Sequence, residues 1–145
     1  MKLSQDATWR LLEGFRWIVN RVPHAPAVSL GGWAGVLVWF FSRARVDRAE
    51  ARCVRVLQVG VTTARAIVKE SYRNLGRGLA EVLRLPSLCP GLLDYVEVHG
   101  EENLREALAK GKGVVALTAH LGNWEFAAAA LAMMGYPMNA IGAEQ

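Results

Sequence analysis

One stretch sets the interpretation of this chain: Gly113-Val114-Val115-Ala116-Leu117-Thr118-Ala119-His120-Leu121-Gly122-Asn123-Trp124-Glu125. Its first half is a short apolar run with β-branched residues, which predicts a buried strand over 114–119. The alanine-rich run 126–134 predicts a helix, with Asn123 as its N-cap and Gly135 in a left-handed C-terminal cap. We therefore expect a strand, a tight turn and a helix.

His120 stands at the end of the expected strand, where open α/β sheets bind their ligands. Glu125 lies in the first turn of the expected helix, near enough to fold back on the imidazole if His120 lies in the preceding turn. A carboxylate partner fixes the tautomer of a histidine and stabilises its protonated form, so the other ring nitrogen can take a proton from a hydroxyl. We predict that His120 is a general base oriented by Glu125. A purely structural hydrogen bond at the strand end is the alternative for His120.

The other residues of the stretch argue against a covalent intermediate and against a metal site. It has no Ser, Cys or Lys placed as a covalent nucleophile, which favours direct transfer between two substrates. The spacing of His120 and Glu125 differs from the HxxxH pairs of zinc-binding helices, and no third ligand is evident, so we expect no metal. Asn123 is more typical of a helix cap than of a substrate ligand.

Two apolar segments near the N-terminus point to a membrane surface. Residues 5–22 have apolar side chains at three- and four-residue spacings, which predicts an amphipathic helix. It either packs on its own domain or lies in the bilayer interface, anchored by Trp9 and Trp17. Residues 27–41 carry no charge, and a helix of that length spans about 22 Å, short of a ~30 Å hydrocarbon core. We expect an interfacial or dipping helix there, and a tilted crossing stays open.

The distribution of charge also favours a membrane surface as the partner. The net charge is +4, and lysines and arginines flank the apolar N-terminal region, where they would attract anionic headgroups. Nucleic acid is the rival, but the sequence has no zinc-ligand spacing, basic heptad helix or aromatic RNA-binding signature. Cys53 and Cys89 belong to no CxxC pair and indicate reduced thiols. Residues 1–22 carry charge throughout and lack the pattern of a signal peptide.

The middle of the chain predicts two more helices, at 48–58 with Asp47 as cap and from Thr62 or Thr63 to Leu85, before Pro86.

A strand at 93–98, a helix at 101–110 and the strand at 114–119 would then form a βαβ unit. The expected fold class is α/β. We divide the chain into a membrane-associated helical segment, 1–45, and the incomplete first part of an α/β domain, 46–145, and interpret it as a fragment of a longer protein.

The central block also carries a resemblance. Gly111-Lys112-Gly113, the apolar run and the TAHLGNWE residues 118–125 are similar to the signature of the lipid A biosynthesis acyltransferases, lauroyl- and myristoyl-type enzymes of the HxxxxD/E acyltransferase superfamily. The segments 71–76 and 98–104 resemble the family too, so the resemblance covers roughly residues 10–145. Leu121 stands where the family commonly has phenylalanine.

The resemblance implies an αβα acyltransferase sheet and transfer of a fatty acyl group from acyl carrier protein or acyl-CoA to a hydroxyl of a lipid A precursor. The reaction would occur at the cytoplasmic face of the inner membrane, without a further cofactor. His120 is implied as general base and Glu125 as its partner, while Gly122, Asn123 and Trp124 would shape the turn or bind substrate. Trp124 would line an acyl groove or pack on the sheet. Transfer to another glycolipid or a glycerophospholipid, and a membrane-bound fragment without turnover, remain alternatives.

Overall fold

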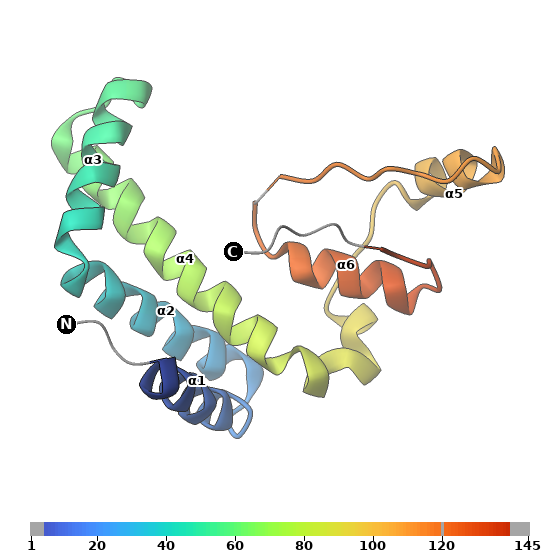
Figure 1. Ribbon diagram of the computed structural model, residues 1–145, viewed down its shortest axis with the longest axis horizontal. Helices are drawn as coiled ribbons and strands as arrows, with labels where there is room; N and C mark the ends of the chain where they lie inside the picture. Colours follow the sequence, from blue (N-terminus) through green and yellow to red (C-terminus); the bar gives the residue numbers. More distant parts are fainter. Residues whose placement is uncertain (1–4, 120, 140–145) are drawn as a thin grey trace. The chain divides into compact units, whose positions relative to one another are not determined.

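The computed structural model in Figure 1 describes residues 5–119 and 121–139. Within these residues the chain is helical, and it divides into two compact units, one ending at Ser87 and one beginning at Leu88. The first unit contains four helices: α1 (Gln5–Val19), α2 (His24–Phe41), α3 (Arg43–Leu57) and α4 (Val61–Leu88). The second contains the 3₁₀ helix η1 (Cys89–Asp94), α5 (Glu101–Ala109) and α6 (Trp124–Met133).

Helices α2 and α4 run side by side in the first unit and touch backbone to backbone (Figure 1). A Cβ atom on Gly31 would collide with the carbonyl oxygen of Gly76, and one on Gly35 would collide with the carbonyl oxygen of Tyr72. Glycine is needed at these positions because small residues alone allow two helix backbones to approach so closely. The glycines of α2 thus permit the close packing of this helix on α4. Gly78, by contrast, has open space beside it.

The apolar core of the first unit has two parts. Val19 of α1, Ala27 of α2 and Ala80 of α4 form one buried cluster, which Phe15 and two further apolar side chains cover. The second cluster lies farther along α2 and consists of Trp39, Val46 of α3 and Val68 of α4. Helices α2 and α4 each contribute to both clusters, so α1 and α3 pack against this pair of helices.

A buried arginine joins the end of α1 to α4. The guanidinium of Arg84 donates hydrogen bonds to the carbonyl oxygens of Val19 and Val22, the second at 2.7 Å. Val19 is the last residue of α1 and Val22 lies in the turn after it. A cation is favoured here because the end of a helix leaves its last acceptors unpaired and carries partial negative charge. Asn20 adds a second link, since its amide donates to the carbonyl oxygen of Leu83 at 3.1 Å.

Several helix boundaries differ from the sequence-based ones. Helix α3 begins at Arg43 after Ser42, so Asp47 lies inside the helix and is not its cap. Helix α4 continues through Pro86 to Leu88. Helix α2 begins at His24, with Pro26 in the first turn, where proline is tolerated.

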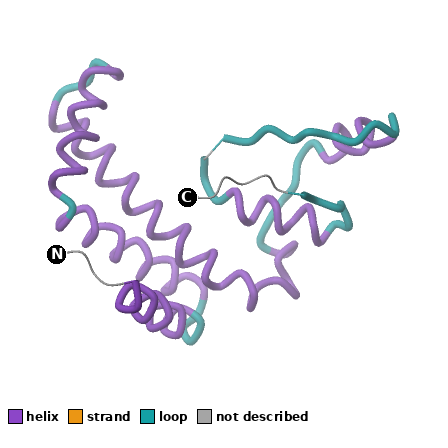
Figure 2. The backbone as a smooth tube through the Cα atoms, viewed as in Figure 1, coloured by secondary structure: helices purple, strands orange, loops and turns teal. Residues whose placement is uncertain are grey.

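The expected sheet is wrong for the part of the chain that the structure describes. Residues 95–100 and 112–119 contain no strand (Figure 2), and 93–98 begins inside η1. The run 114–119 is exposed, with Val115 88% and Leu117 95% accessible to solvent. β-Propensity reflects packing and pairing with neighbours rather than a strong preference of the backbone, and neither segment has a partner strand among these residues. The α/β prediction is therefore corrected to an all-helical description.

Candidate functional site

The turn ahead of α6 is built around a glycine. Gly122 has a φ of +67°, in the left-handed region that residues with a Cβ atom rarely adopt. Just before it, the N–H of Leu121 donates to the carbonyl oxygen of Ala119 at 2.7 Å, which turns the chain. The predicted turn is therefore present at Gly122, although the segment 112–119 ahead of it is not a strand.

Asn123 caps α6. Its side-chain oxygen accepts a hydrogen bond from the N–H of Phe126 at 3.3 Å, which satisfies one of the donors that a helix N-terminus leaves unpaired. The predicted cap is confirmed, and the same contact occupies the oxygen of Asn123 that would otherwise be available to a substrate. The C-terminus follows expectation as well: Gly135 has a φ of +90°, and the N–H of Tyr136 donates to Leu131 at 3.1 Å, as in a Schellman motif.

Glu125 occupies the first turn of α6 and is half-buried. A carboxylate is favoured there because the N-terminal end of the helix carries partial positive charge. His120 lies outside the described residues, so the predicted contact between the imidazole and Glu125 stays a prediction. Trp124, the first residue of α6, is 36% exposed, and the two roles considered for it remain open.

A charged network in the second unit joins α5 to the residues after α6. The hydroxyl of Tyr136 donates to one oxygen of Glu101 at 2.6 Å, and the other oxygen lies 3.0 Å from the guanidinium of Arg105. The hydrogen bond to Glu101 raises the pKa of Tyr136, because ionisation of the phenol would break it. The negative charge of Glu101 raises the pKa of Arg105. This network ties the segment after α6 to the first turn of α5.

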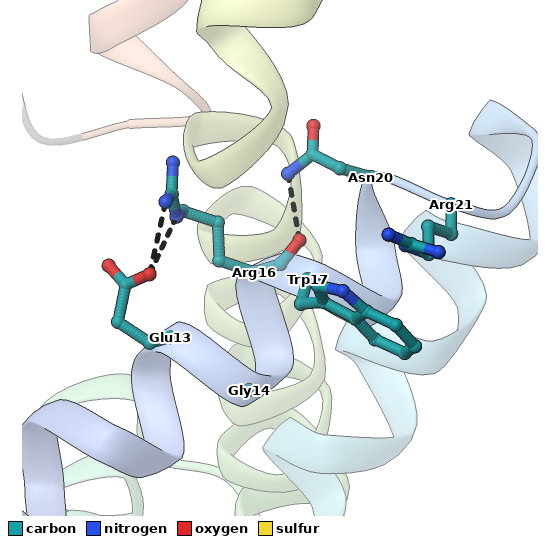
Figure 3. Close-up of a pocket in the computed structure, with 6 residues that line it drawn as sticks. All are labelled: Glu13, Gly14, Arg16, Trp17, Asn20 and Arg21. Carbon is teal, nitrogen blue, oxygen red and sulfur yellow. Dashed lines mark hydrogen bonds and ion pairs between the residues drawn. The ribbon is translucent and has the colours of Figure 1, made fainter.

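A shallow, open depression of about 660 Å³ lies along α1 in the first unit (Figure 3). Its charged groups already have partners: Arg16 lies 3.0 Å from Glu13, and the guanidinium of Arg21 stacks 4.1 Å from the ring centroid of Trp17. Within the described residues, no group of three or more His, Cys, Asp or Glu side chains is arranged to hold a metal ion. The depression contains none of the predicted catalytic residues.

The first unit also contains a cluster of basic and aromatic side chains that the sequence analysis did not predict. Helix α4 has cations at four-residue intervals, Arg65, Lys69, Arg73 and Arg77, which place them along one side of the helix. The first two lie against the ring of Trp39 in α2. The four-residue spacing of these cations could have been recognised in the sequence. The contact with Trp39 could not, because it depends on the packing of α2 on α4.

One comparison with known proteins gave a match. The family model described as bacterial lipid A biosynthesis acyltransferase matches residues 2–145, which includes the whole block around His120 and Glu125. Neither the curated proteins nor the solved structures gave a match to this chain.

Proposed function

The chain belongs to the bacterial lipid A biosynthesis acyltransferases, and we propose that it transfers a fatty acyl group from acyl carrier protein or acyl-CoA to a hydroxyl of a lipid A precursor. The observation that carries this proposal is the family match over residues 2–145. Membership of this family identifies the protein as an acyltransferase. The donor, the acceptor and the catalytic residues are our proposal.

In the proposed mechanism, His120 removes the proton of the acceptor hydroxyl while Glu125 orients the imidazole and stabilises its protonated form. The acceptor oxygen attacks the thioester carbonyl and forms a tetrahedral intermediate. The intermediate collapses with cleavage of the carbon–sulfur bond, and the protonated His120 returns the proton to the departing thiol. The products are the acylated lipid and the free thiol of the carrier, without a covalent acyl-enzyme.

The geometry ahead of α6 is compatible with these roles. The left-handed turn at Gly122 and the cap by Asn123 set the N-terminus of α6, which begins four residues after His120 in the sequence. The partial positive charge of that N-terminus would stabilise an oxyanion near it. Because the side chain of Asn123 is engaged by Phe126, its part in substrate binding would be to set the turn. Gly122 and Trp124 are proposed as further residues near the substrate.

A location at the cytoplasmic face of the inner membrane is also proposed, and α2 supports a membrane contact. By length and composition α2 could cross a bilayer, although at 18 residues it spans only about 27 Å. Its outward face is apolar and exposed over about 100° of the helix circumference: Leu30, Trp33, Leu37, Phe40 and Phe41. The face toward α4 contains the closely packed glycines, so the exposed apolar face is not needed for that contact.

The test is an acyl-transfer assay with the full-length protein in detergent, an acyl donor and a lipid A precursor, read by the mass of the product. We expect His120→Ala to lower the rate by about 10²-fold or more, the usual contribution of a general base. His99→Ala is the matched control, because His99 is an exposed histidine paired with Glu97 outside the block, and its activity should equal that of the wild type.

Unchanged turnover in the His120 variant would remove this residue from the mechanism. Acylation of a glycerophospholipid or another glycolipid in place of the lipid A precursor would redirect the proposal to that acceptor. Absence of turnover in the wild type with any acceptor would favour a non-catalytic membrane-bound fragment.

A further inference from the structure

The indole of Trp39 is surrounded by cations where α2, α3 and α4 meet. Trp39 is only 7% exposed. The guanidiniums of Arg43 and Arg65 lie 5.7 and 5.4 Å from the ring centroid, and the ammonium of Lys69 lies 5.3 Å from it. Each distance is within the range of a cation–π contact. Three positive groups from two helices therefore gather around one side chain of a third helix.

This cluster carries more positive than negative charge. Arg43 has an acidic partner, Asp47, at 3.1 Å. Within the described residues, Arg65 and Lys69 have no carboxylate within ion-pair distance. The next two cations of the α4 row differ, since Arg73 and Arg77 both contact Glu70, which neutralises part of their charge. The excess of positive charge is thus concentrated at the Trp39 end of the row.

The same position contains an unsatisfied hydrogen-bond donor. The ring N–H of Trp39 is buried and has no acceptor among the described residues. A buried donor without an acceptor is unfavourable and uncommon in folded proteins. Repulsion among the three cations is unfavourable as well. An anion with several acceptor oxygens would offset both costs at once.

We propose that Arg43, Arg65, Lys69 and Trp39 bind the phosphate group of an anionic lipid headgroup. Arginine and lysine are the side chains that recognise phosphate oxygens. The lipid is favoured over a soluble phosphate because the next residues of α2, Phe40 and Phe41, are apolar and 59% and 77% exposed. A bilayer that contacts these rings would bring anionic headgroups to the same end of α2 as the cluster. This site is separate from the acyl-transfer reaction, so it extends the proposed function without relying on it.

The test measures flotation of the full-length protein with vesicles of phosphatidylcholine alone or mixed with phosphatidylglycerol. The variant Arg65→Gln/Lys69→Gln removes the two cations that lack a carboxylate partner. We expect it to lower partition into the phosphatidylglycerol vesicles about tenfold or more, given the contribution of each basic residue near an anionic surface. Partition into phosphatidylcholine should not change, and Arg65→Lys/Lys69→Arg should bind like the wild type.

The control is Arg45→Gln/Arg52→Gln, which removes the same charge from two exposed positions of α3 outside the cluster. We expect a loss of less than about threefold, from diffuse electrostatics alone. Equal losses in the two double variants, or no loss in Arg65→Gln/Lys69→Gln, would overturn the site. Circular dichroism on each variant establishes that the helices are intact, and an unfolded variant is replaced by the corresponding single substitutions.

A second arm separates a lipid phosphate from a soluble one. Inorganic phosphate, compared with chloride at equal ionic strength, should lower the partition of the wild type toward that of Arg65→Gln/Lys69→Gln and leave the variant unchanged. No competition by phosphate would overturn the assignment to a phosphate group. Calorimetric binding of phosphate at the cluster, together with normal vesicle partition of the variant, would assign the site to a soluble anion and overturn the lipid.

Discussion

The two units differ in what holds their helices in place. In the first, α4 packs against its neighbours through two buried clusters, backbone contacts at glycines and the buried Arg84. In the second, Leu92 of η1 and Ala130 of α6 are buried, while the run 114–119 is exposed. Local features such as the Asn123 cap and the Gly122 turn set the conformation there. Burial thus organises the unit proposed to contact membrane, and local hydrogen bonds organise the block that carries the proposed chemistry.

The strongest test of this contrast substitutes Gly76, where the backbones of α2 and α4 meet. A Cβ atom there would lie 2.8 Å from the nitrogen of Gly35, so Gly76→Ala must push the helices apart. We expect a loss of about 3 kcal/mol in the free energy of unfolding, at the upper end for overpacking, measured by denaturant unfolding followed by circular dichroism.

The matched control is Gly78→Ala, two residues away in the same helix but with open space beside it. It should stabilise the protein by about 1 kcal/mol, the difference in helix propensity. Equal effects of the two substitutions would contradict the close approach of α2 and α4.

A smaller effect is expected in the second unit from Asn123→Ala. Loss of the cap leaves the N–H of Phe126 without its acceptor and should destabilise α6 by about 1 kcal/mol. Hydrogen exchange of the α6 amides is the measurement, and Asn123→Asp, which keeps a capping oxygen, should restore protection. If Asn123 acted instead as a substrate ligand, the alanine variant would raise KM without faster exchange in α6.

The smallest effect concerns pH. The pKa of Tyr136 is raised in the folded protein by its hydrogen bond to Glu101, so this contact stabilises the fold below the unfolded-state pKa of the phenol. The contribution disappears as the pH rises through the folded-state pKa. Wild type and Tyr136→Phe should therefore differ most in unfolding midpoint near neutral pH and converge in alkali. A difference that grows with pH would show that the hydrogen bond is not the cause.

Hydrophobic periodicity and local capping residues were sufficient to predict most of the helices from the sequence. The amphipathic pattern of 5–22, the apolar run within α2 and the expected helix at 101–110 all correspond to helices of the structure, with ends that differ by a few residues. Asn123 and Gly135 were identified correctly because a cap depends on residues close in sequence. The strands at 93–98 and 114–119 were wrong because neither segment supplies by itself the partner strand that it needs. The domain division after residue 45 and the catalytic roles of His120 and Glu125 stay predictions.

By itself, the sequence determined the family, the helical periodicities and the turn and cap ahead of α6, since each depends on residue types at short, fixed spacings. Only the tertiary structure decided which glycines lie against another backbone, that Arg84 caps α1 from α4, and that Trp39 gathers cations from two other helices. Such contacts join residues tens of positions apart. Their energies depend on distance and burial, which no local pattern of residues specifies.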